Sequence, residues 1–262
     1  MQKAILAVVV VIALAVIGWV LWPADEPPPA PEPEPPAEPA PPPQPEPPSR
    51  EPLEPGEPTA PPEPEVVLPP LQESDAFVRE RLAPMDLPER WVEQGDYVRR
   101  LAVLAENASR GELPRRQLAF MAPRGEFKVV RRGERLFLDP ASYDRYDRYV
   151  EELEQIDPAY AANLVKTLEP LVQDALVELG VQAPPGEVFE AAIREVLAVP
   201  VLPDDGSVEL VQPNVMYEYA NPELEALSPL KKQVLRMGPE NVRRLQDYLR
   251  QVAAALNIDL AS

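Results

Sequence analysis

The sequence predicts a chain of three unlike parts that ends in a mainly α-helical domain with minor β structure, an α+β fold. Three observations lead to this prediction. The first residues form an uncharged apolar run, the next are dominated by proline and glutamate, and the rest have apolar residues at helical spacing. We therefore divide the chain into a transmembrane signal anchor over residues 1–22, a linker over 23–70 and an exported globular domain over 71–262.

The apolar run extends from Ala4 to Trp22 and matches the roughly twenty residues that a helix needs to cross a bilayer. A cleaved secretory signal is the main alternative. Such a signal has a shorter apolar region and small residues at its cleavage site, whereas Trp19 and Leu21 stand at that end here. Lys3 precedes the run and acidic residues follow it, so we expect a single-pass protein with a cytoplasmic N-terminus and an exported C-terminal domain.

The linker is close to half proline, and its eleven acidic residues face the single basic residue Arg50. It has almost no apolar surface to bury, so we expect it to be disordered. Consecutive prolines favour the extended polyproline II helix, and repulsion between the glutamates resists collapse. Two interpretations remain open, a stiff spacer and a docking peptide for a proline-binding groove.

The globular part is expected to be a helical domain with one or two small hairpins. Helices are predicted over residues 74–82, 87–109, 143–156, 158–179, 188–197, 229–237 and 239–257. We expect Pro170 to kink or divide the longest of these. A hairpin is predicted around Arg132 and Gly133, and two β-prone runs flank Pro213.

Composition excludes several kinds of chemistry. The 262 residues include no cysteine and no histidine, which removes disulfides, thiolate nucleophiles, Cys/His zinc sites and histidine bases. We expect no metal and no cofactor. The 44 acidic and 25 basic residues give a formal charge of −19, which argues against nucleic acid as a partner.

The leading candidate site is a basic cluster in this acidic chain. If the fold brings its residues together, we expect them to form an anion- or partner-binding surface. Its members are Arg110, Arg115, Arg116, Arg124, Lys128, Arg131, Arg132 and Arg135. The same segment contains only three acidic residues. The guanidinium fork suits carboxylate and phosphate groups, so lipid headgroups, cell-wall carboxylates or an acidic protein are the expected ligands. The alternative is that these residues neutralise acidic helices of the same domain.

Three weaker candidates lie on predicted helices. The first is a row of carboxylates at helical spacing, Asp144, Asp147 and Glu151, which either supply an acid/base pair or form only a solvated face. The second is a row of tyrosines at helical spacing, Tyr143, Tyr146 and Tyr149, which either stack on a sugar or belong to the core. A second basic group consists of Lys231, Lys232, Arg236, Arg243 and Arg244.

Four stretches carry a family resemblance: LPPLQESDAFVRE (68–80), ENASRGELPRRQ (106–117), FLDPASYDRYD (137–147) and KKQVLRMGPENVRRLQ (231–246). Together they resemble the bacterial family of domains of unknown function numbered 3014, over essentially the whole exported domain. The resemblance implies a membrane-anchored protein with a proline-rich segment and implies no activity.

These observations lead us to expect a binding, scaffold or accessory protein of the bacterial envelope. Residues 4–22 would hold it in the inner membrane and the helical domain would lie in the periplasm, in contact with an envelope protein or an anionic wall or lipid component. One alternative is a cell-wall enzyme that uses carboxylates. Another is a component of a secretion or energy-coupling complex that spans the membrane once.

Overall fold

The computed structural model describes residues 66–260, except 86, 116 and 120–121. The predicted anchor and most of the predicted linker lie outside these residues. Within the described part, no helix is both long enough and apolar enough to cross a membrane. The residues from Val67 onward belong to one compact unit, and the account below concerns that unit.

Helices make up most of the unit, as predicted. They are α2 (Ser74–Leu82), α3 (Glu89–Val92), α4 (Tyr97–Ser109), α5 (Asp144–Glu154), α6 (Pro158–Glu178), α7 (Pro185–Leu197), α8 (Pro222–Glu225), α9 (Pro229–Leu235) and α10 (Pro239–Leu256). Short 3-10 turns lie at Leu71–Glu73, Ala83–Met85 and Pro140–Ser142.

Several helix starts follow directly from local sequence. The Asp157 carboxylate accepts the amide of Tyr160 at 2.7 Å, and Pro158 occupies the first helical position of α6. Ser228 caps α9 in the same way and is also followed by a proline. These caps satisfy amides that would otherwise lack a partner at the helix ends.

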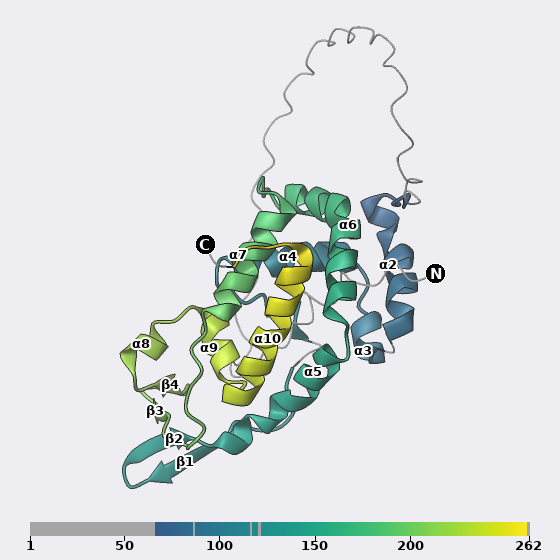
Figure 1. Cartoon of the computed structure of the whole chain (residues 1–262). Helices are drawn as coiled ribbons and strands as arrows, with labels where there is room; N and C mark the ends of the chain where they lie inside the picture. Colours follow the sequence, from purple (N-terminus) through teal and green to yellow (C-terminus); the bar gives the residue numbers. More distant parts are fainter. Residues whose placement is uncertain (1–65, 86, 116, 120–121, 261–262) are drawn as a thin grey trace, which may run out of the picture. The chain divides into compact units, whose positions relative to one another are not determined.

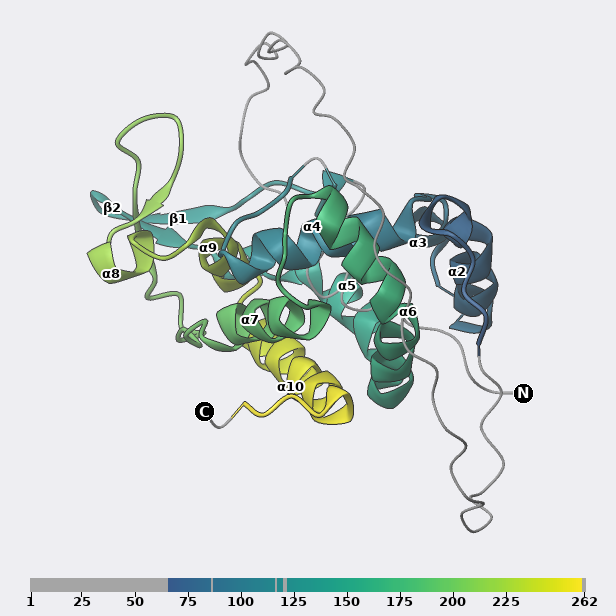
Figure 2. The ribbon, with the colours of Figure 1, turned by 90° about the horizontal axis from the view of Figure 1, so that it is seen from above.

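The core lies between helices with amphipathic faces. α4 packs against α6 and α7, and α10 packs against α5, α6 and α7 (Figures 1 and 2). Leu101 on α4, Leu168 on α6 and Leu245 on α10 are fully buried. Burial of such side chains stabilises the fold by about 1.5–3 kcal/mol each, so the apolar stripes dominate the packing.

The strands form one antiparallel sheet in the order β1 (Val129–Arg132), β2 (Arg135–Leu138), β3 (Glu209–Val211) and β4 (Glu218–Tyr219). The two predicted β regions are therefore joined, through the pairing of Phe137 with Glu209 and of Leu136 with Leu210. In both views the sheet lies at the end of the unit opposite to α2 (Figures 1 and 2).

The mainly helical class with minor β structure is confirmed, and one detail differs from prediction. Residues 87–109 do not form one helix, because Gly95 and Asp96 adopt positive φ angles of 61° and 52° and separate α3 from α4. Pro170 lies inside α6, which continues through it as one helix, so of the two effects expected from this proline the division does not occur.

Candidate functional site

Two of the stretches that carry the family resemblance, residues 137–147 and 231–246, meet where α5 and α10 begin. Gly238 precedes α10 with a φ of +85°, and a Cβ built on it would lie 2.4 Å from Cγ of Tyr143. Only glycine allows this approach without strain, because other residues disfavour positive φ and carry the Cβ that would overlap. The backbone before α10 therefore lies directly against the tyrosine ring.

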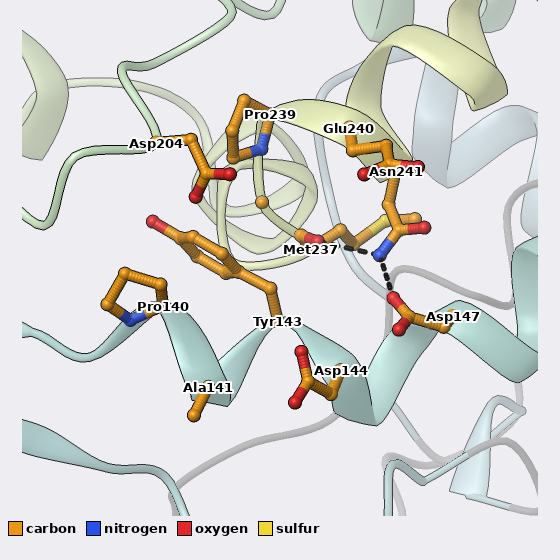
Figure 3. Close-up of a pocket in the computed structure, with 11 residues that line it drawn as sticks. Pro140, Ala141, Tyr143, Asp144, Asp147, Asp204, Met237, Pro239, Glu240 and Asn241 are labelled. Carbon is orange, nitrogen blue, oxygen red and sulfur yellow. Dashed lines mark hydrogen bonds between the residues drawn. The ribbon is translucent and has the colours of Figure 1, made fainter.

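A pocket of about 340 Å³ opens beside this contact (Figure 3). Four carboxylates line it, from Asp144 and Asp147 on α5, Asp204 on the loop before β3, and Glu240 on α10. None of its lining residues is basic, so the negative electrostatic potential of the pocket attracts cationic groups. Among the residues that the structure describes, no three acidic side chains lie close enough together to hold a metal ion.

Hydrogen bonds and burial constrain the pocket walls. The amide of Asn241 donates to the Asp147 carboxylate at 2.7 Å and to the Met237 carbonyl at 3.0 Å, which ties α10 to α5 (Figure 3). Burial raises the pKa of Tyr143 to about 12, and the charges of Asp204 and Asp205 act in the same direction. The tyrosine hydroxyl is thus neutral at physiological pH.

The three tyrosines at helical spacing are all buried: Tyr143, Tyr146 and Tyr149. This agrees with the core interpretation. The rings of Tyr146 and Tyr149 pack inside the unit and offer no exposed platform on which a sugar could stack, whereas Tyr143 also lines the acidic pocket.

The predicted basic cluster is spread over several elements. Arg110 ends α4 and forms ion pairs with Glu106 and, at 3.6 Å, with Glu112. The carbonyl of the following residue, Gly111, accepts a hydrogen bond from the amide of Leu230 at 3.0 Å. This part of the cluster therefore lies beside α9. Arg115 and Arg124 are exposed loop residues, and Arg116 lies outside the described residues.

The remaining four basic residues lie in the β1–β2 hairpin or, for Lys128, directly before it, and all are exposed. We call them the hairpin cations: Lys128, Arg131, Arg132 and Arg135. The pairing register places Arg132 opposite Arg135, on one face, and Arg131 opposite Leu136, on the other. The structure therefore brings four of the predicted site residues together, with their side chains on both faces of one hairpin.

Two hairpin cations are held by neighbours. Arg135 forms a bidentate ion pair with Glu209 on β3, and the guanidinium of Arg132 lies 4.7 Å from the centre of the Phe137 ring. Such contacts reduce side-chain freedom and leave some donors facing solvent. Charged residues on an edge strand such as β1 also discourage pairing with further strands.

The second basic group is largely neutralised within the unit. Lys231 pairs with Glu195 at 3.0 Å, Lys232 pairs with Glu225, and Arg244 pairs with Glu154. The ion pairs of these three residues account for their charges without a ligand.

Comparison with curated proteins found no matching relative, and comparison with solved structures found no match. In the comparison with protein families, a sequence model matches residues 97–253, from the start of α4 almost to the end of α10. The matched region includes the hairpin, the acidic pocket and the Gly238–Tyr143 contact. The chain therefore belongs to the family described as protein of unknown function DUF3014.

Proposed function

We propose that this protein is a membrane-anchored binding or accessory protein of the bacterial envelope, and that its hairpin cations contact an acidic partner. In this proposal the apolar run at residues 4–22 lies in the inner membrane, the proline-rich segment is a spacer, and the folded unit lies in the periplasm. The acidic partner is an envelope protein or an anionic component of the wall or membrane.

The observation that carries the proposal is the position of the hairpin. Its four cations lie at the end of the unit opposite to α2, the first α-helix after the linker (Figures 1 and 2). The described chain enters the unit beside α2, so the hairpin lies at the end of the unit that is remote from this entry.

Electrostatics favour an acidic partner. The chain carries a formal charge of −19, so a compact group of four cations is a local reversal of sign. Lys128 and Arg131 form no ion pair within the described part of the chain, and they are the members with the most freedom to bind. Complementary charge at such a site raises the association rate and selects partners.

The test is in-cell crosslinking of the full-length protein, followed by mass spectrometry, with two charge-reversal variants. The test variant combines Lys128→Glu and Arg131→Glu. The control combines Arg243→Glu and Arg250→Glu, which changes the net charge equally at exposed positions of α10. We expect the crosslinked partner to be lost in the hairpin variant and kept in the control. Equal recovery from both variants would contradict the assignment of the hairpin.

Membrane placement needs its own experiment. Protease added to spheroplasts should digest the folded unit while the inner membrane stays intact, and the full-length chain should remain in the membrane fraction. Protection of the folded unit until the cells are lysed would overturn the periplasmic location.

A further inference from the structure

The acidic pocket between α5 and α10 plays no part in the proposed contact of the hairpin with a partner. Its four carboxylates come from α5, α10 and the loop before β3, so the fold and not helical spacing alone brings them together. Within the described part of the chain, none of the four forms an ion pair. By contrast, Glu152 and Glu154 on the same helix α5 are both paired with arginines. The pocket therefore concentrates negative charge that the unit itself does not neutralise.

Polar and apolar groups occupy different parts of this pocket. Three of the carboxylates, those of Asp144, Asp204 and Glu240, belong to exposed residues and form an acidic rim. The side chains of Tyr143 and Met237 are buried and form an apolar floor (Figure 3). A rim and floor of this kind suit a ligand that has charged ends and an aliphatic body.

Two pocket-lining residues also have polar atoms without a hydrogen-bond partner. Tyr143 is only 9% exposed, and its hydroxyl, which forms no hydrogen bond within the described residues, points into the pocket between Pro140 and Asp204 (Figure 3). Asn241 is 2% exposed, and its amide nitrogen donates to two acceptors, which leaves Oδ1 buried without a donor. The neutral tyrosine hydroxyl can accept a hydrogen bond from a ligand N–H group.

The charge and size of the pocket narrow the class of cation. Within the described residues no group of acidic side chains is close enough to hold a metal ion, so the carboxylates suit an organic cation that reaches them separately. The volume of about 340 Å³ falls in the range of small-molecule pockets. A single ammonium group would leave most of the negative charge unbalanced, whereas several ammonium groups on one chain can pair with different carboxylates.

We propose that the acidic pocket binds an aliphatic polyamine, a methylene chain that carries two or more ammonium groups. The ammonium groups pair with the carboxylates of the rim, and the methylene chain lies on the floor formed by Tyr143 and Met237. The Tyr143 hydroxyl accepts a further hydrogen bond from the ligand. This site is independent of the hairpin cations, whose proposed partner is acidic.

The proposal is tested by thermal unfolding of the full-length protein in a neutral detergent. Spermidine is compared with n-butylamine, magnesium chloride and sodium chloride at equal ionic strength. We expect a saturable rise in Tm of about 5–10 °C with spermidine at a hundredfold excess over Kd. Spermidine that binds the folded and unfolded chains equally leaves Tm unchanged, so the shift reports a site that requires the fold. An equal rise with n-butylamine or with magnesium chloride, or no rise beyond that in sodium chloride, would overturn the assignment to a polyamine.

Three variants make the test specific. The double variant Asp144→Asn and Glu240→Gln removes two charges of the rim and should weaken spermidine binding about tenfold to a hundredfold. The matched control, Glu169→Gln with Asp174→Asn, makes the same charge change at exposed positions of α6 and should leave the shift unchanged. Tyr143→Phe keeps the ring and should weaken binding about twofold to tenfold. Equal shifts in the parent and in the rim variant would place spermidine elsewhere and refute the site.

Discussion

Replacement of Gly238 by alanine tests whether the contact between α5 and α10 is as tight as the structure shows. The new Cβ would lie 2.4, 2.7 and 2.8 Å from atoms of Tyr143, a buried side chain that has little room to move. Overpacking of this kind costs about 1–3 kcal/mol. The φ of +85° adds about 1–2 kcal/mol for a residue with a side chain.

The expected loss of unfolding free energy is therefore about 2–5 kcal/mol, or a fall in Tm of roughly 5–15 °C for a unit of this size. The matched control is Gly133→Ala in the hairpin turn, where φ is +64° and nothing lies within 4 Å of the added Cβ. It should lose only the contribution from φ. Urea unfolding followed by circular dichroism measures both free energies, and equal losses would refute the steric reasoning.

Three further predictions concern charge and capping. Asp75→Ala should destabilise the protein by about 0.5–2 kcal/mol in urea unfolding, because the Asp75 carboxylate accepts two amides at the start of α4; an unchanged midpoint would contradict the cap. At high pH, stability should be complete below the ordinary tyrosine pKa near 10 and decline toward pH 12, because burial raises the pKa of Tyr143 to about 12. Tyrosinate absorbance, compared with that of Tyr143→Phe, should show no ionisation of Tyr143 near pH 10 while the fold is intact. At low pH, the hydrogen bond from Arg244 lowers the pKa of Glu154, so its contribution is present above the ordinary glutamate pKa and lost as pH falls through the lowered value. Arg244→Gln should therefore flatten the acid limb of stability against pH, and an identical slope would argue against this pair.

Local chemistry explains which parts of the fold were predictable. Asp157 followed by Pro158 marks the start of α6, and Gly133 sits at positive φ in the hairpin turn, so short-range patterns located both elements correctly. The break between α3 and α4 was missed because Asp96, a residue with a side chain, also adopts a positive φ. The backbone conformation of Asp96 is stabilised by Asp75, 21 residues earlier in the chain, whose carboxylate accepts the amide of Asp96 at 2.7 Å. Capping across that separation leaves no periodic signal.

The candidate sites show the same division. Sequence reasoning found the hairpin cations, because four basic residues within a short β segment stand out in an acidic chain. It named Asp144 and Asp147 but did not join them with Asp204 and Glu240, which line the same pocket. These residues come from α5, α10 and the loop before β3, so only the tertiary structure shows that they meet.

The position of α10 has a consequence for biosynthesis. This helix packs against α5, α6 and α7, and it is synthesised after all three. Until it emerges, the apolar faces that it covers remain open to chaperones, proteases and other nascent chains. Folding of the unit therefore cannot finish before α10 has been synthesised, and a protein truncated before α10 should be recognised as unfinished and degraded.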